Sequence, residues 1–206
     1  MAFSDDYESF RAAVPRFIDW TGYTTTHVDD LIAVSERKVY KALRTRANEF
    51  RFSINAGSGG TVAVPDDYEE MKSARMSAAP ARKLVRKSVE EIYSRFGDRS
   101  VTGNQLWFAR EGDVFIFGPA GAAGDTMQGV YYRSGTSMAQ SATINSIFAA
   151  HPDIFLMAAA SESSAYIGMD SRIAVWEQKF QQLIAIANQA ARDEDTSGSI
   201  LVGSLG

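Results

Sequence analysis

The sequence contains no cysteine, and its 206 residues include only two histidines, His27 and His151. The absence of thiols excludes disulfides, thiolate metal sites and cysteine nucleophiles, and it suits a reducing compartment. A Ser-His-Asp or histidine-metal site would need partner residues that the sequence does not signal near either imidazole. We therefore expect both histidines to cap helices or to lie at the surface, and we expect no catalytic residue, metal or cofactor.

Long hydrophobic runs are also missing. The longest apolar stretches, such as residues 154–160, fall well short of the roughly 20 residues that a membrane-spanning helix needs. The first six residues are acidic rather than basic and apolar, which is not the pattern of a secretory signal peptide. We therefore expect no membrane partner and no secretion.

Charge is small overall and unevenly distributed. The formal net charge is -4, with 16 Lys+Arg against 15 Asp+Glu in residues 1–100 and 5 against 10 in residues 101–206. A hydrophobic content of 45% over 206 residues is sufficient to bury a core near the size of one large domain. No repeat or linker is evident, so we expect a single domain over residues 1–192.

Helical periodicity dominates the N-terminal part of the chain. Residues 5–19 have near-helical apolar spacing interrupted by Pro15, and Thr26 is placed to cap a second helix. The apolar stripe expected on that second helix comprises Val28, Leu31, Ile32, Val39, Leu43 and Phe50. One face of this helix must therefore pack against the rest of the protein.

The C-terminal part is helical as well. We expect helices over residues 145–150 and 152–167, the second with Pro152 in its first turn and Gly168 as its stop. Asp170 is placed to cap the last helix. Apolar residues recur along it in steps of three and four at Ile173, Trp176, Phe180, Leu183, Ile184 and Ala187. This spacing predicts a long amphipathic helix with one buried face.

The middle of the chain alternates in the manner of β-strands. Apolar residues alternate with polar ones on both sides of the glycine-rich residues 56–60, which predicts a hairpin over residues 50–64. A strand is expected over residues 83–86, and residues 105–133 read as a small antiparallel meander. These patterns place β-rich parts at about 50–64 and 83–133.

Two short helices are expected between these strands. The first covers residues 66–76, because its opening acids would suit the positive end of a helix: Asp66, Asp67, Glu69 and Glu70. The second follows the capping-box sequence that begins at Ser88, and it ends at Gly97. The predicted fold class is therefore α+β, mainly a helical bundle with a small antiparallel β-rich insertion and an extended C-terminal arm over residues 193–206.

Two segments invite a chemical interpretation. The glycine-rich residues 118–126 could in principle surround a phosphate, but a P-loop requires Gly-Lys-Ser/Thr where this sequence has Gly124, Asp125 and Thr126. The acids at 66–70 could bind a hard metal or act in acid-base catalysis, yet they lack calcium-loop spacing. A turn and a helix start are the simpler interpretations, and a carboxylate-dependent enzyme remains a minor alternative.

Basic residues form two clusters, at residues 37–51 and 82–87, and either could contact nucleic-acid phosphates. The aromatic residues of the predicted strands could likewise stack on bases. Half-buried packing explains the aromatic residues better, and pairing with acidic protein surfaces explains the cations better. A nucleic-acid-binding module that uses both basic clusters remains the alternative function.

Several segments in order carry a family resemblance. They are residues 31–36, 43–49, 64–72, 115–119, 129–132 and 152–156, followed by Trp176. Together they span roughly residues 17–190, and their specificity lies in their order and spacing. In this respect the sequence resembles the head-to-tail adaptor, or connector, proteins of tailed bacteriophages.

The resemblance implies a structural virion protein without enzymatic activity. It implies a homo-oligomeric ring, usually of twelve copies, in the neck at the head-tail interface, assembled in the host cytoplasm. The implied partners are the portal protein on one side and a tail or neck protein below the ring. Genomic DNA would pass through the ring non-specifically during ejection, and the C-terminal arm would dock the ring.

Two sets of candidate contact residues follow. The first is the apolar part of the arm, Ile200, Leu201, Val202 and Leu205, which we expect to bury against the portal or a neighbouring adaptor. Copies in a ring meet through two different surfaces, so complementary charge is expected across each seam. The subunit-interface candidates are Arg37, Arg44, Arg46 and Glu49.

Overall fold

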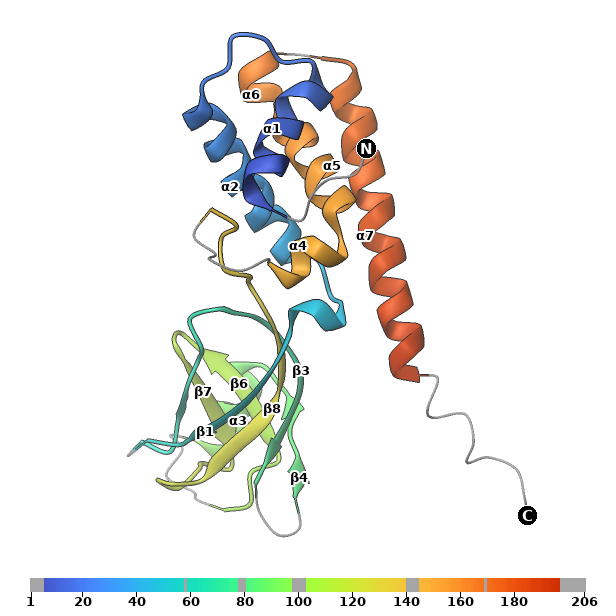
Figure 1. The fold of residues 1–206 in the computed structure, drawn as a ribbon. Helices are drawn as coiled ribbons and strands as arrows, with labels where there is room; N and C mark the ends of the chain where they lie inside the picture. The colour runs from blue at the N-terminus through green and yellow to red at the C-terminus, as the bar shows by residue number, and fades with distance from the viewer. Residues whose placement is uncertain are drawn as a thin grey trace, which may run out of the picture. The chain divides into compact units, whose positions relative to one another are not determined.

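The computed structural model describes residues 6–57, 59–77, 81–97, 103–139, 145–168 and 170–196. The predicted α+β class is confirmed: helices and strands both contribute extensively (Figure 1). The chain divides into two compact units, unit 1 with residues 1–48 and 134–206, and unit 2 with residues 49–133. The expected single domain over residues 1–192 stays a prediction.

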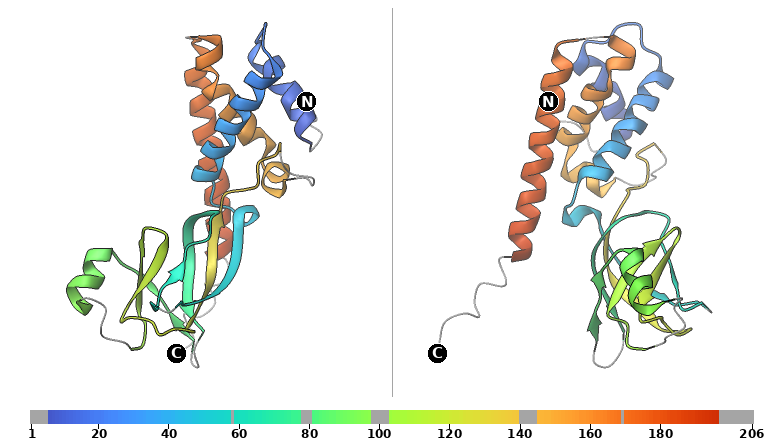
Figure 2. Two further views of the ribbon diagram at one scale, coloured as in Figure 1. Left: turned by 90° about the vertical axis from the view of Figure 1, so that its left-hand side faces the viewer. Right: turned by 180° about the vertical axis from the view of Figure 1, so that it is seen from behind.

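Unit 1 is helical. Its elements are α1 (Tyr7–Ile18), α2 (Thr25–Ala42), the 3-10 turn η1 (Arg46–Asn48), α4 (Ser146–Ala150), α5 (Pro152–Glu162), α6 (Ser164–Ile167) and α7 (Arg172–Thr196). Helix α5 packs against α1, α2 and α7 (Figure 2). Its side chains are apolar on almost every side, from Ile154 to Ala160, and a helix of that composition must be enclosed by others.

The core of unit 1 joins residues from both ends of the chain. Val14 of α1, Leu31 of α2, Phe155 of α5 and Phe180 of α7 are all buried in one cluster. On α7, Trp176 and Ile184 are also buried, whereas the predicted stripe members at 173, 183 and 187 are partly buried. The amphipathic pattern therefore identified the packed face of this helix.

Unit 2 consists of two four-stranded sheets and one helix. The first sheet has the order β1-β8-β3-β4, with β1 (Glu49–Asn55), β8 (Thr126–Arg133), β3 (Tyr68–Met76) and β4 (Arg82–Lys83). The second has the order β2-β7-β6-β5, with β2 (Val62–Ala63), β7 (Val114–Gly118), β6 (Trp107–Glu111) and β5 (Val85–Arg86). The paired strands are antiparallel except β5 and β6, which are parallel. Helix α3 (Val89–Phe96) completes the unit.

The side chains of β7 alternate between two hydrophobic clusters. Phe115 and Phe117 are buried in a cluster with Phe52 and Met127 of the first sheet. Ile116, between them, is buried on the other side with Ile92 of α3. Successive strand residues point to opposite faces, so a continuous apolar strand has to be covered on both.

Several local predictions are confirmed. Ser88 and Glu91 form the predicted capping box of α3, whose C-cap is Gly97. Helix α4 covers residues 146–150, and α5 begins at Pro152. The carboxylate of Asp170 accepts a hydrogen bond of 2.8 Å from the backbone N–H of Arg172 at the start of α7. These signals depend on neighbouring residues alone, which makes them readable in the sequence.

The predicted helix over residues 66–76 is wrong. This segment contains β3, which lies between β8 and β4 and turns Ala74 and Met76 into the core of unit 2. The acid at 67 does not begin a helix; the Asp67 carboxylate accepts a hydrogen bond of 2.6 Å from the hydroxyl of Tyr131. Pairing on both sides has overridden the local helical preference of this segment.

The predicted strand pairings need two corrections. The hairpin over residues 50–64 is wrong, because β1 pairs with β8 while β2 pairs with β7 in the other sheet. The meander is right for β6 and β7 but wrong for β8, which joins the first sheet between β1 and β3. Hydrophobic alternation identifies strands but not their partners when two sheets share one core.

Three helix boundaries also differ from the predictions. The N-cap of α2 is Thr24, whose hydroxyl accepts a hydrogen bond of 3.3 Å from the N–H of His27, and not Thr26. Helix α2 ends at Ala42, so Phe50 does not belong to its apolar stripe. Phe50 lies in β1 instead, where it is 44% exposed. The helix expected over 152–167 is divided at Ser163 into α5 and α6.

Candidate interaction surfaces

The cations of the first basic cluster have different surroundings. Lys38 of α2 is the most enclosed: its ammonium group lies 2.6 Å from Glu162 of α5 and 2.5 Å from Glu177 of α7. It also donates a hydrogen bond of 2.8 Å to the hydroxyl of Ser161. Burial opposes the charged form, but hydrogen bonds to both carboxylates hold the pKa of Lys38 above its ordinary value. Lys38 therefore joins three helices of unit 1.

The predicted seam residues are placed as follows. Arg37 is exposed on α2. The guanidinium of Arg44 donates to the carbonyl of Leu43 at 2.8 Å, beyond the C-terminal end of α2. Arg46 lies 3.1 Å from Glu194 of α7, and both side chains are more than half exposed. Glu49 belongs to unit 2, where it lies 2.6 Å from Lys72. Each of the four thus has different neighbours, and their role between copies stays a prediction.

A buried carboxylate of α2, that of Glu36, binds residues 137 and 138, which follow unit 2 in the chain. The Glu36 carboxylate of α2 is 4% exposed and accepts hydrogen bonds from the N–H of Met138 at 2.6 Å and the hydroxyl of Ser137 at 3.1 Å. Burial raises the pKa of Glu36, and these two donors counteract part of that rise. Sequence patterns gave no sign of this contact, since its partners are about a hundred residues apart.

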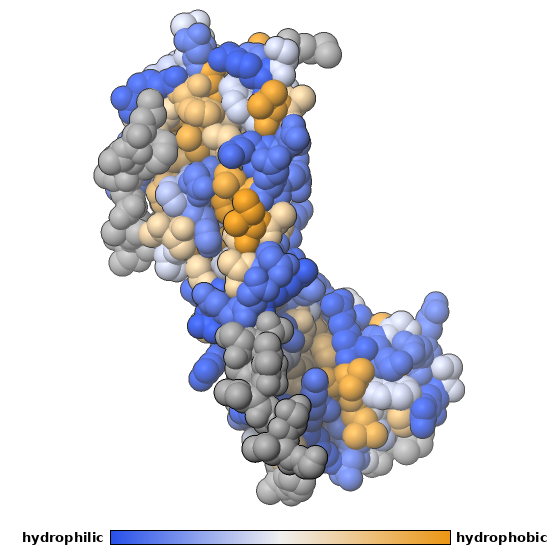
Figure 3. All heavy atoms as spheres, turned by 90° about the vertical axis from the view of Figure 1, so that its right-hand side faces the viewer, coloured by the Kyte–Doolittle hydropathy of each residue, from blue (hydrophilic) through white to orange (hydrophobic). Residues whose placement is uncertain are grey.

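The outer face of α7 has apolar side chains in contact with solvent. Val175 and Ile186 are 63% and 67% exposed, and the residues on the same side include Gln182 and Gln189. In Figure 3, which views this side of the protein, hydrophobic side chains are interspersed with hydrophilic ones on unit 1. Lys179 and Asp193 lie on the same side by their helical spacing and are also exposed, so this face combines apolar, polar and charged side chains.

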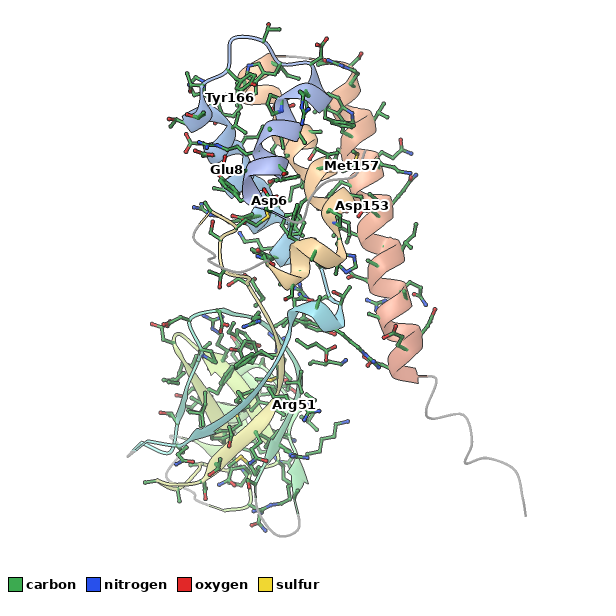
Figure 4. The ribbon with its side chains drawn as sticks, viewed as in Figure 1. Asp6, Glu8, Arg51, Asp153, Met157 and Tyr166 are labelled. Atoms are coloured by element: carbon green, nitrogen blue, oxygen red, sulfur yellow. The ribbon has the colours of Figure 1, made fainter. Side chains whose placement is uncertain are left out.

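Aromatic rings cluster where the loop between α1 and α2 meets α6. The ring of Trp20 lies 5.0 Å from that of Tyr166, 5.7 Å from that of Tyr23 and 6.1 Å from that of His27, measured between centroids. Tyr166 is labelled in Figure 4 at this end of unit 1. His27 is thus exposed, as predicted, and contributes a stacked ring. Sequence analysis missed the cluster because no periodic pattern connects its members.

His151 connects two helices. It is the C-cap of α4 and also the N-cap position of α5, where its side chain makes no capping hydrogen bond. Burial lowers the pKa of His151, while the nearby Asp153 acts in the opposite direction. The expected cap or surface position is confirmed for the exposed His27, whereas the half-buried side chain of His151 forms no cap.

A concave surface lies on the solvent side of the first sheet of unit 2. It encloses about 670 Å³ and has the cations Arg51, Arg75 and Lys83 in its lining. Ser73, Gly129 and Val130 form part of the surface between them. We call it the cationic groove. Residues from both basic clusters of the sequence are therefore brought together on one sheet.

The glycine-rich loop after β7 is a closed turn. The Asp125 carboxylate accepts hydrogen bonds from the N–H of Ala122 at 2.8 Å and from the side chain of Gln105 at 2.9 Å. An anion at this position would face the carboxylate that already fills it. The turn interpretation is confirmed, and the strand aromatics Phe108, Phe115 and Tyr131 are buried as predicted.

The described residues were also compared with the requirements of a metal site and of a membrane-spanning helix. Within residues 6–196, gaps excepted, no three or more His, Asp or Glu side chains are arranged to hold a metal ion. None of the helices in that part of the chain is long and apolar enough to cross a membrane. The apolar arm residues Ile200, Leu201, Val202 and Leu205 lie outside the described residues.

Exposed apolar side chains and a cationic concavity are features that proteins of macromolecular assemblies commonly present. Comparison with protein families supplies the particular assembly: the model of the SU10 adaptor protein family matches residues 5–202. The chain therefore belongs to the SU10 adaptor protein family, a family of phage head-to-tail adaptors. A comparison with curated proteins finds no match. Membership confirms the resemblance seen in the sequence and implies portal and tail partners in the neck of a virion.

Proposed function

We propose that the protein forms a homo-oligomeric ring of about twelve copies between the capsid portal and the tail of a bacteriophage. The family match over residues 5–202 carries this proposal. The ring acts without catalysis, assembles in the host cytoplasm and surrounds the path through which genomic DNA leaves the head.

Features of unit 1 support a role in a ring. A closed ring of identical copies needs two different surfaces per copy, one for each neighbour. The outer face of α7 offers exposed Val175 and Ile186, and α2 offers exposed Arg37 together with Val34, which is 46% exposed. Both helices pack against α5, and we assign the exposed residues of α2 to one neighbour in the ring and those of α7 to the other.

The C-terminal arm, residues 193–206, is the proposed docking element. Its last ten residues could extend about 33 Å at roughly 3.3 Å per residue, enough to reach beyond one subunit. Apolar side chains at 200–202 and 205 then bury against the portal or a neighbouring adaptor. The acids before them remain with the end of α7.

Deletion of residues 194–206 tests the docking element. We expect the shortened chain to remain folded, because the core of unit 1 ends near Ala187, but to fail to join heads to tails. Complementation of an adaptor-deficient phage gives the readout, and circular dichroism gives the folding control. Unimpaired head-tail joining by the shortened chain contradicts the role of the arm.

A further inference from the structure

The cationic groove has three cations on one face of one sheet. Along β1, Arg51 is exposed and the next residue, Phe52, is buried, while along β3, Arg75 is exposed between buried Ala74 and Met76. Arg75 is paired in register with Lys83 of β4, which is also exposed. Because the side chains of a strand alternate between its two faces, all three cations project to the solvent side.

The groove also has a defined width. Its cations lie on β1, β3 and β4, and the strand order β1-β8-β3-β4 separates the outermost by three strand spacings. At about 4.8 Å per spacing the cations extend over roughly 14 Å, which exceeds the 10–12 Å diameter of a helix with its side chains. Val130 and Gln128 of β8 lie on the same face between these cations.

The three cations of the groove have no acidic side chain among the residues that line it. In the part of the chain that the structure describes, Arg51, Arg75 and Lys83 make no ion pair, and the ten residues that line the groove include no acid. Arg75 donates a hydrogen bond of 3.3 Å to the side-chain carbonyl of Gln128. A groove lined by three cations and no carboxylate fits an acidic occupant.

The same chain supplies a matching acidic element. Helix α7 ends with three consecutive exposed acids, Asp193, Glu194 and Asp195. Acids at the C-terminal end of a helix oppose its macrodipole, and nearby cations offset this. Glu194 lies 3.1 Å from Arg46, and Asp193 accepts a hydrogen bond of 2.7 Å from the side chain of Gln189.

We propose that the cationic groove of each copy binds the acidic end of α7 from the next copy in the ring. This inference rests on the proposed ring, in which each seam is heterologous and repeats identically. The cations of the groove and the acids of the helix end are opposite in charge, so their contact across the seam is attractive. The ten residues beyond the helix then remain available to reach the portal.

Nucleic acid is a less suitable occupant. Strong non-specific binding to duplex DNA typically uses about 6–10 phosphate contacts, and the groove supplies three cations. The chain as a whole is negatively charged, which repels a polyanion. DNA is accordingly the competing outcome in the experiment below.

Charge reversal in two separate chains tests the pairing. R51E/R75E/K83E makes the groove acidic, and D193K/E194K/D195K makes the helix end basic. Each variant alone then opposes like charges at every seam, whereas an equal mixture can alternate around a ring with opposite charges at every seam. Native mass spectrometry with the portal protein measures ring formation for each variant and for the mixture.

We expect the wild-type chain to form rings with the portal, each variant alone to require at least roughly tenfold more protein for assembly, and the mixture to recover wild-type behaviour. Recovery by mixing separates contacts between copies from contacts within one chain. The matched control R86E/R95E/R110E makes the same charge change at exposed positions of unit 2 outside the groove, and it should assemble normally.

Three results overturn the proposal. The first is ring formation by both reversed variants alone at wild-type concentrations, which leaves the proposed function intact. The second is failure of the mixture to recover. The third is salt-dependent binding of a 30-base-pair duplex by wild-type protein that R51E/R75E/K83E abolishes, which assigns the groove to DNA. If the wild-type chain forms no ring with the portal, the proposed function fails, and the pairing fails with it.

Discussion

Lys38 and the cations of the groove come from similar stretches of sequence but occupy opposite environments. Lys38 lies among α2, α5 and α7 with two carboxylates within 2.6 Å. Arg51, Arg75 and Lys83 lie on an open sheet face without an ion pair among the described residues. Removal of a charge that is enclosed with its partners leaves those partners uncompensated and destabilises its own unit. A charge on an open surface is accessible to another molecule.

The largest effect is expected at the centre of the groove, from Gly129→Ala. A β-carbon at this position would lie 2.1 Å from the backbone oxygen of Ser73 and 2.9 Å from the ring of Phe52. Since β8 pairs on both sides, neither neighbour can move without disturbing the sheet, and we expect a loss of about 3 kcal/mol in unfolding free energy.

Chemical denaturation measures this loss. Gly57→Ala is the matched control, because its nearest contact would be the oxygen of Thr61 at an ordinary 3.9 Å. If residues 1–192 behave as one domain, Gly129→Ala shifts a single transition that includes the helices of unit 1. A stability equal to that of wild type contradicts the close packing at the groove centre.

The next effect concerns the enclosed charge. Lys38→Ala leaves Glu162 and Glu177 close together without their shared cation, and it removes the ammonium group that lies 4.9 Å from the ring centre of Phe180. We expect about 2 kcal/mol of destabilisation, since the site is only partly accessible to water. This corresponds to a fall in Tm of about 4–8 °C.

Lys41→Ala serves as the control on the same helix, where the side chain is exposed. Its effect should stay within about 0.5 kcal/mol. Equal Tm values for the two variants would mean that Lys38 does not hold the helices of unit 1 together.

A pH-dependent effect is expected at Glu36. Burial raises its pKa in the folded protein above the ordinary 4.5, so folding favours the protonated form. Its contribution to stability is therefore fully present below about pH 4.5 and is lost as pH rises through the folded pKa. Relative to Glu36→Gln, wild-type protein should gain stability as pH falls from neutral toward 4.5.

Paired thermal unfolding of both proteins at several pH values measures this difference, and contributions from groups common to both cancel. Glu8→Gln provides a control, because that carboxylate is exposed near the start of α1. A difference between wild type and Glu36→Gln that does not vary with pH contradicts the assignment.

The smallest effects on stability are expected from the exposed cations. Reversal of the groove in R51E/R75E/K83E should change the unfolding free energy by less than about 1 kcal/mol, and Arg46→Ala by less than about 0.5 kcal/mol. Thermal unfolding checks both. A large loss of stability in either variant would show that these cations support their own chain and would remove the contrast with Lys38.

The elements that could be predicted from sequence are those with local causes. The capping box at Ser88, the proline at the start of α5 and the stripe along α7 each depend on residues within a few turns of one another. Pairing of β1 with β8 joins residues more than seventy positions apart, and no local pattern encodes it. The helix expected over 66–76 failed for the same reason.

The candidate surfaces were predictable only in part. Both basic clusters were recognised, yet their division into an internal Lys38 and an open groove depends on which strands and helices meet. The aromatic cluster at Trp20 and the contact of Glu36 with Met138 have no sequence signature. The family resemblance, by contrast, was recognised from the order of segments along the sequence. The family match over residues 5–202 confirms this resemblance.

The central claim is that this protein of 22.5 kDa works as a ring of copies bound to a portal. Native mass spectrometry of the chain alone and mixed with the portal protein tests it most directly. We predict a complex with the portal that contains a closed ring of about twelve copies. A monomer that persists both alone and in the presence of the portal would contradict the account.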